Sequence, residues 1–150
     1  MNLCYPVTLK TYKNGTVGAT FPDVPEAITC GKTADEAVGM AADALVVALS
    51  SYLDDRRQIP SPSKRQRGQT VLWLPPRVAL KAAIHNAMIS RGMLQSELAE
   101  KLGIDARQVR RLIDFDHESR LSQLDAALEA LGLRATIGIV KVQTPSTKAA

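Results

Sequence analysis

The chain has 150 residues, 45% of them hydrophobic and 23% charged, which is the composition of an ordinary globular protein and not of a disordered one. No apolar run approaches the roughly 20 residues that span a bilayer, and the N-terminus lacks the basic and apolar regions of a secretory signal. Two cysteines, Cys4 and Cys30, are too few for a disulfide framework and are expected as free thiols. We therefore predict a cytoplasmic protein without membrane contact.

The net charge of +4 is distributed unevenly along the chain. Residues 1–60 contain five Lys or Arg against seven Asp or Glu, a balance of −2, whereas residues 61–150 contain fourteen against eight, a balance of +6. Segregation of charge favours two binding roles, because a basic half suits a polyanion such as DNA and an acidic half suits a basic partner.

The first thirty residues predict a small antiparallel sheet. Apolar and polar residues alternate between Leu3 and Phe21, around the pair Asn14-Gly15. An Asn-Gly pair between alternating segments is the strongest short-range signal for a hairpin, because both residues tolerate a positive φ. Two prolines interrupt the pattern, and residues 27–30 are expected to return as a third short strand.

A long helix is expected after the third strand, covering one face of the sheet. Thr33 is a candidate N-cap, and Glu36 three residues later completes a capping box. Apolar residues then recur at i, i+3 and i+4 spacing as far as Tyr52, which gives the helix one apolar face. A connector rich in proline and serine, residues 59–64, leads to a fourth strand over residues 70–74.

The pattern turns helical at residue 78 and predicts four helices separated by short breaks. These helices are expected over residues 80–91, 96–102, 106–115 and 121–131. Residues 134–142 alternate weakly and are expected as a strand that pairs across a dimer, because a single strand needs a mate. The tail, residues 144–150, is expected to be disordered. Together the elements predict an α+β chain with an acidic domain over residues 1–76 and an all-α domain over residues 77–143.

Residues 95–112 have the spacing of a helix-turn-helix. Ala99 is small where two helices cross, Gly103 can take the positive φ of the turn, and Asp105 can cap the second helix. Arg can bind guanine and Gln can bind adenine through two hydrogen bonds each, and each such pair contributes about 1 to 3 kcal/mol of discrimination. Residues at the start of the first helix are placed for phosphate contacts. The expected DNA-binding residues are Gln95, Ser96, Arg107, Gln108, Arg110 and Arg111.

One helix-turn-helix makes too few contacts for tight specific binding, so a homodimer or tetramer that reads two half-sites is expected. Four leucines follow the motif at helical spacing: Leu121, Leu124, Leu128 and Leu131. They could form the dimer surface or close the core of the helical domain, and the sequence leaves both interpretations open.

Several short motifs occur in the order found in the HicB antitoxins of bacterial toxin-antitoxin pairs, and the chain resembles that family over roughly residues 3–140. The motifs are the Asn14-Gly15 hairpin, Phe21-Pro22-Asp23-Val24-Pro25, Thr29 with Gly31, Thr33-Ala34-Asp35-Glu36-Ala37, an Ala-rich helix and Ile59-Pro60-Ser61-Pro62-Ser63. The C-terminal half is similar to the helix-turn-helix branch of the family. Glu26 departs from the pattern, because the family usually has glycine at that position.

The resemblance implies that the N-terminal domain is a partial RNase H-like fold that binds a small mRNA-cleaving HicA toxin. It also implies that the C-terminal domain represses the pair's own operon by binding operator double-stranded DNA. An RNA-cleaving toxin needs a basic surface for its substrate, which an acidic domain can cover by charge complementarity. The expected toxin-facing residues are Phe21, Asp23, Val24, Pro25, Glu26, Asp35 and Glu36. Each acidic residue alone could also be a solvated surface charge, and core packing is the favoured alternative for Phe21.

Catalysis, a metal site and a cofactor are not expected. An RNase H-type nuclease needs three or four carboxylates around two metal ions, and Asp23 is the only carboxylate at a predicted strand end. His85 and His117 have no cysteine or second histidine at ligand spacing, so each is expected in a surface or capping role. The alternative function is a stand-alone transcriptional regulator whose N-terminal domain senses a ligand or assembles oligomers.

Overall fold

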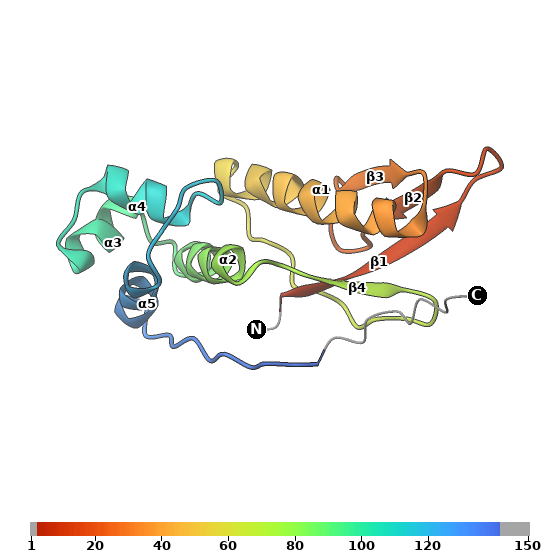
Figure 1. Ribbon diagram of the computed structural model, residues 1–150. Helices are drawn as coiled ribbons and strands as arrows, with labels where there is room; N and C mark the ends of the chain where they lie inside the picture. The colour runs from red at the N-terminus through yellow and green to blue at the C-terminus, as the bar shows by residue number, and fades with distance from the viewer. Residues whose placement is uncertain (1–2, 142–150) are drawn as a thin grey trace.

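The computed structural model describes residues 3–141 as an elongated α+β molecule, which confirms the predicted fold class (Figure 1). A four-stranded sheet and the long helix α1 (Ala34–Asp54) occupy one end, and three short helices occupy the other. Helix α2 (Pro76–Ser90) lies between the two ends. The predicted tail, residues 144–150, lies outside the described residues.

The sheet is antiparallel throughout, in the order β3-β2-β1-β4. Its strands are β1 (Cys4–Thr11), β2 (Val17–Thr20), β3 (Ile28–Gly31) and β4 (Thr70–Trp73). The predicted hairpin is confirmed: Tyr12 N–H donates to the Thr16 carbonyl at 2.8 Å, and Gly15 takes a φ of 86°. Asn14 accepts the backbone N–H and hydroxyl of Thr16, which closes the turn.

Helix α1 packs its apolar stripe on the sheet, as the spacing predicts. Its buried residues are Ala37, Ala41, Leu45, Leu49 and Tyr52. Thr33 caps the helix by accepting Glu36 N–H, but the Glu36 carboxylate reaches the N–H of Lys32 instead of that of Thr33. The helix is long and apolar enough to cross a membrane. Because its stripe covers the sheet, it is the core helix of this domain.

The second half of the chain contains the four predicted helices with shifted ends. Helix α2 begins earlier than predicted because Pro76 occupies its first turn, where the missing N–H costs nothing. Helices α3 (Gln95–Leu102), α4 (Ala106–Ile113) and α5 (Leu121–Ala130) follow. Helix α4 ends before the predicted residue 115, because Asp114 is extended at ψ 123°. Residues 134–141 form no strand with another described residue.

Two hydrophobic cores meet along α2. Val78 and Ala82 belong to the core beneath α1, whereas Ile84 and Met88 belong to the core of the helical end. Phe115 comes just after α4, but its side chain is buried in the core of the sheet and α1. The two ends of the molecule are therefore joined by packed side chains as well as by the chain itself.

Buried polar groups on α2 hold the connector that follows α1. The Asn86 side chain accepts the N–H of Ile59 at 2.8 Å and donates to its carbonyl at 2.9 Å, as a neighbouring strand would. His85 Nε2 lies 2.7 Å from the Arg57 carbonyl, which can only accept, so this nitrogen carries the proton. His85 is 3% exposed, so the expected surface role is wrong for this residue, which instead binds a backbone carbonyl just after α1.

Lys81 is the third buried polar residue of α2, and its side chain is fully buried. Its Nζ donates to the carbonyls of Asp114 at 2.5 Å and His117 at 2.6 Å, directly after α4. Desolvation lowers the pKa of Lys81. The ammonium therefore ties α2 to the segment that carries Phe115 into the other core.

Replacement of Asn86 by alanine is expected to destabilise the fold by about 1 to 3 kcal/mol, because it leaves the buried backbone groups of Ile59 unpaired. Urea unfolding measures the change. Gln58→Ala, an amide removed from the adjacent exposed surface, is the matched control and should change stability by less than about 0.5 kcal/mol. Equal losses in the two variants would contradict the role of Asn86.

Stability is also expected to fall as the pH drops below 6.5, the ordinary pKa of histidine. Burial lowers the pKa of His85 in the fold, so the unfolded chain binds a proton that the folded chain resists. This contribution is complete above pH 6.5 and is lost as the pH falls toward the lowered value. Urea unfolding across this range should show a smaller pH dependence in His85→Gln, whereas His117→Gln, at an exposed site, should behave as the parent chain.

Candidate DNA-binding helix-turn-helix and partner-binding surface

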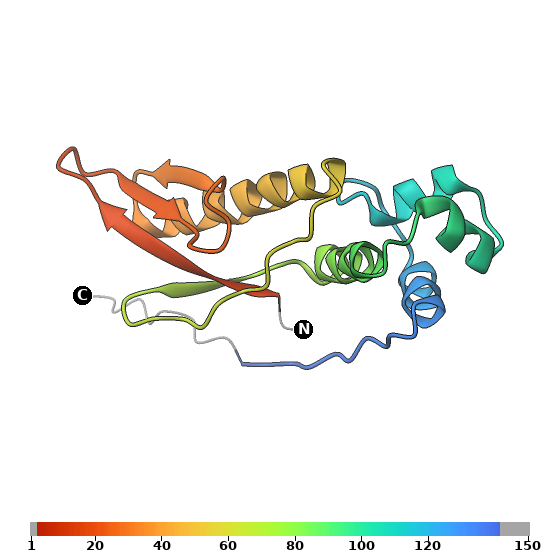
Figure 2. The same cartoon turned by 180° about the vertical axis from the view of Figure 1, so that it is seen from behind.

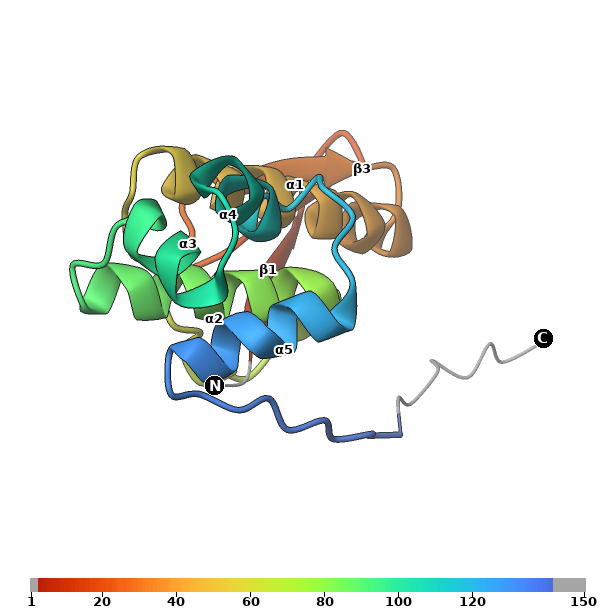
Figure 3. The ribbon, with the colours of Figure 1, turned by 90° about the vertical axis from the view of Figure 1, so that its left-hand side faces the viewer.

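Helices α3 and α4 form a helix-turn-helix at the end of the molecule farthest from the sheet, as the end-on view in Figure 3 shows. Gly103 takes the left-handed conformation of the turn, with φ 66° and ψ 31°. Asp105 accepts Gln108 N–H at 2.8 Å, and the Gln108 side-chain oxygen accepts Asp105 N–H at 3.0 Å. This reciprocal cap uses the carbonyl oxygen of Gln108 and leaves its amide NH₂ free to donate.

The arginines of α4 face solvent. Val109, Leu112 and Ile113 are buried on the inner side of the helix. Arg107, Arg110 and Arg111 are exposed and, at i, i+3 and i+4 spacing, share the outer side. None of these three forms an ion pair within residues 3–141. The outer side of α4 therefore presents three positive charges that no described carboxylate neutralises.

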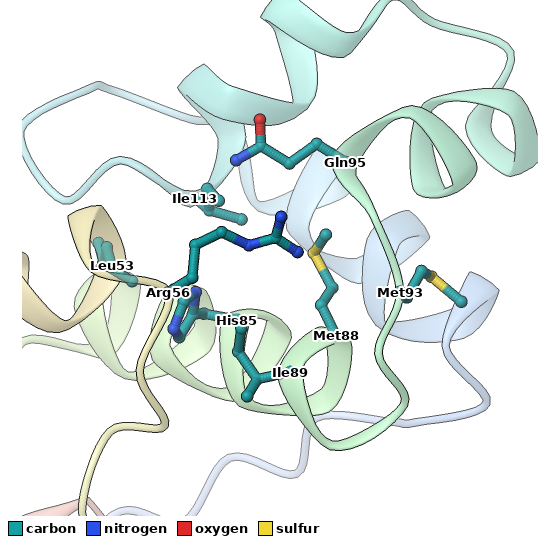
Figure 4. A pocket seen from close by; sticks show the side chains of 8 residues that line it. All are labelled: Leu53, Arg56, His85, Met88, Ile89, Met93, Gln95 and Ile113. Atoms are coloured by element: carbon teal, nitrogen blue, oxygen red, sulfur yellow. The ribbon is translucent and has the colours of Figure 1, made fainter.

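The two predicted phosphate contacts on α3 point in different directions. Ser96 is exposed, whereas Gln95 is half-buried and lines a small cavity at the junction of the two ends. Figure 4 shows the Gln95 side chain extending toward Ile113, above the Arg56 guanidinium, with His85 and Met88 contributing to the lining from α2. Of the pair, Ser96 is the one whose side chain can reach a phosphate without rearrangement.

The loop between β2 and β3 is anchored by its apolar residues. Phe21 is 2% exposed and Val24 is fully buried, so both side chains hold the loop on the core. Asp23 accepts hydrogen bonds from the backbone and hydroxyl of Ser63, and Pro25 is exposed. Only part of the predicted toxin-facing loop is therefore available to another molecule.

Glu26 connects this loop to the end of α1. Its carboxylate accepts the Tyr52 hydroxyl at 2.9 and 3.0 Å and lies 3.7 Å from the Arg57 guanidinium. Its own backbone N–H and the Tyr52 hydroxyl hold the pKa of Glu26 below its ordinary value. Arg57 lies over the Tyr52 ring, 4.0 Å from its centroid. The φ of Glu26 is not positive, so the backbone at this position does not require the glycine that HicB antitoxins usually have there.

The structure does not bring all the predicted toxin-facing residues together. Asp35 and Glu36 are exposed in the first turn of α1, whereas Glu26 lies at Tyr52 near its end. Asp35 and Tyr52 are seventeen positions apart, which corresponds to about 25 Å of helix. The acidic residues expected as one site are therefore two groups at opposite ends of α1.

Sequence reasoning missed another surface on α1, because the apolar spacing counted Met40 among the residues of the buried face. Met40, Asp43 and Val47 follow Glu36 at helical spacing on the outer side of α1, where Met40 is 46% and Val47 72% exposed. We call this row, Glu36, Met40, Asp43 and Val47, the outer α1 face. The sequence does indicate such a surface, because α1 contains more apolar residues than its buried stripe accounts for.

No group of three or more His, Cys, Asp or Glu side chains among residues 3–141 is arranged to hold a metal ion. The surfaces that this part of the chain offers are an exposed row of arginines and an acidic helix face with exposed apolar residues.

The fold defines the class of this protein: a small α+β sheet domain joined to a helix-turn-helix at the far end of the molecule. A family model described as the HicB-like antitoxin of bacterial toxin-antitoxin systems matches residues 4–83. Because that match covers more than half of the chain, the chain belongs to the HicB-like antitoxin family.

Relatives in three bacteria match along most of their own length. "Antitoxin HicB 1" of Photorhabdus laumondii is 36% identical over 138 residues, which are 92% of this chain and 88% of the relative. "Antitoxin HicB" of Pseudomonas fluorescens is 38% identical over 83% of this chain and 86% of the relative. "Antitoxin HicB" of Escherichia coli K12 is 34% identical over 91% of this chain and 99% of the relative. The similarity therefore includes the helix-turn-helix and not only the sheet domain.

Proposed function

We propose that this antitoxin neutralises a small mRNA-cleaving HicA-type toxin in the cytoplasm by direct binding, and represses its own operon through the helix-turn-helix. The proposed repression is supported by one observation, the row of three exposed arginines on the capped helix α4. The protein acts by occupying surfaces, so no reaction, metal or cofactor enters the mechanism.

Helix α4 suits the major groove of operator DNA. Its buried residues pack on α3, while Arg107, Arg110 and Arg111 extend from the opposite side. In a helix-turn-helix the second helix lies in the groove and its exposed side chains reach base edges and phosphates. Gln108 contributes its free amide hydrogens, and Ser96 contributes a hydroxyl at the start of α3.

The outer α1 face is the best candidate for toxin contact. It combines exposed apolar side chains with the carboxylates of Glu36 and Asp43, and Asp35 adds a further carboxylate in the same turn as Glu36. A protein that cleaves RNA needs a basic substrate surface, which this face complements in charge. Met40 and Val47 would supply the apolar contacts that hold the complex. Neutralisation then follows because the antitoxin covers the surface that RNA would occupy.

A homodimer is proposed for the DNA-bound state, with a tetramer as its further assembly. Ile137 and Ile139 are 80% and 97% exposed in the extended segment that follows α5. Two such segments pairing across a two-fold axis would satisfy their backbone groups and cover these side chains. Of the four leucines at helical spacing, Leu124, Leu128 and Leu131 close the helical core, whereas Leu121 is 58% exposed and available to a second copy.

Replacing both Arg107 and Arg111 by alanine is expected to weaken operator binding by about 30-fold or more, since each arginine contributes at least about 1 kcal/mol to base recognition. Fluorescence anisotropy with the operon's promoter DNA measures this change. Arg65→Ala with Arg67→Ala removes the same charge from the sheet end and should leave operator affinity within about twofold. If the α4 double variant bound the operator normally, or failed to rescue growth from the toxin, the proposed division of labour would be wrong.

A charge reversal on the outer α1 face, Asp43→Lys with Val47→Lys, is expected to abolish co-purification with the product of the adjacent small toxin gene and rescue from its growth arrest. Both side chains are exposed, so the thermal stability of the antitoxin should change little. The control Asp125→Lys with Glu129→Lys alters two exposed acids on α5 and should retain both activities. Normal co-purification of the α1 variant would place the toxin elsewhere.

A further inference from the structure

The sheet has a second face, which is turned away from α1. Tyr5 and Val7 point into the core, so the residues that alternate with them point the other way. Residues directly opposite in antiparallel strands share a face, and the register therefore adds the partners of these residues. Figure 2 shows the strands from this side, with no helix over them. We call this surface the open sheet face; it contains Cys4, Pro6, Thr8, Lys10, Tyr12, Gly18, Thr20, Ile28, Cys30, Val71 and Trp73, of which Pro6 and Gly18 are buried.

Large apolar side chains stand exposed on the open sheet face. Trp73 is 53%, Tyr12 47% and Ile28 68% exposed. The Tyr12 ring lies over Gly18. A Cβ at position 18 would come within 2.7 Å of the ring, so only glycine leaves room for the ring. Cys4, opposite Trp73, and Lys10, opposite Gly18, are six residues apart on β1, or about 20 Å. The face thus presents two aromatic rings, one toward each end of β1.

The surroundings of these rings are basic. Lys10 lies on the face itself, with its Nζ 5.7 Å from the centroid of the Tyr12 ring. The hairpin turn adds Lys13, and the loop over residues 61–69 adds three further cations, all exposed: Lys64, Arg65 and Arg67. Gln69 donates to the Thr8 hydroxyl at 3.0 Å, which places this loop at the rim of the face.

No acid offsets these charges within the same elements. The four strands, the hairpin turn and the loop over residues 61–69 contain five Lys or Arg and no Asp or Glu. Asp23, which meets the start of the loop, is already engaged by the backbone and hydroxyl of Ser63. The open sheet face and its rim are therefore cationic.

We propose that the open sheet face binds single-stranded nucleic acid, with Trp73 and Tyr12 stacking on bases and the five cations contacting phosphates. Exposed rings on a sheet together with a basic rim are what a single strand requires, because its bases are unpaired and its backbone is anionic. A basic toxin or a second open sheet face would be repelled by the same charges. An acidic polypeptide would match the charge but would leave the aromatic rings without planar partners.

This site is distinct from the operator site. Helix α4 lies at one end of the elongated molecule and the open sheet face at the other, beyond α2 (Figure 1). The proposal does not depend on toxin binding, because the outer α1 face lies on the opposite side of the sheet. It adds a second nucleic-acid surface, one that reads single strands by stacking and charge.

The chain contains one tryptophan, Trp73, so its fluorescence reports directly on this face. Titration of the full chain with oligo(U) and with oligo(dT) should quench this emission, and comparison of the two distinguishes RNA from DNA as the preferred strand. Trp73→Ala, followed by anisotropy of a labelled oligonucleotide, should weaken binding by at least about 5-fold, the smallest effect expected for one stacked base.

The charge contribution is tested with two matched triple variants. Lys64→Gln, Arg65→Gln and Arg67→Gln should reduce the steepness of the salt dependence of oligo(U) binding by about 2 in log–log slope, as expected for three lost phosphate contacts on a single strand. Arg107→Gln, Arg110→Gln and Arg111→Gln remove the same charge from α4 and should leave the oligo(U) titration unchanged. Circular dichroism melting verifies that each variant is folded.

Three outcomes would overturn the proposal. Absence of quenching at low salt would mean that the face does not bind single strands. Equal quenching by polyglutamate would show that it binds acidic chains by charge alone. Quenching that follows protein concentration without any oligonucleotide would assign the face to a second copy of the chain.

Discussion

The arrangement of the molecule depends on how α2 is held against the segments on either side of it. Asn86 pairs with both backbone groups of Ile59, His85 donates to Arg57, and Lys81 binds the carbonyls that end α4. Each of these side chains is buried, so its desolvation is offset only while the partner segment stays in place. Phe115 adds an apolar contact in the same direction. The sheet end and the helix-turn-helix end are therefore held together by one set of contacts.

A short series of contacts also links α2 to the loop between β2 and β3. Glu26 binds Tyr52, Arg57 stacks on Tyr52, and the Arg57 carbonyl accepts from His85 on α2. The proposed surfaces themselves remain apart: the arginines of α4 lie at one end, and the outer α1 face lies along the other. Such an arrangement lets one chain carry two partners at once without overlap.

Local signals in the sequence were sufficient for most of the elements, because each has its own chemistry. Asn14-Gly15, Thr33, Gly103 and Asp105 occupy the turn and caps that their residue types predict. The early start of α2 was missed although Pro76 is a local signal for a first helical turn, whereas the extended Asp114 was missed because the tertiary packing of Phe115 decides where α4 ends. For the same reason His85 could not be recognised as buried: its partner is a backbone carbonyl 28 positions away.

The candidate sites were predicted less well than the fold, because exposure decides which side chains can bind. Phe21 and Val24 are in the core, and Gln95 faces a cavity, although all three were named as expected binding residues. The most direct test of the whole account is an electrophoretic mobility shift assay in which the toxin is added to the complex of this chain with operator DNA. Separate surfaces predict a slower band that contains all three components. Release of free DNA in place of that band, with toxin and operator excluding one another, would contradict the account.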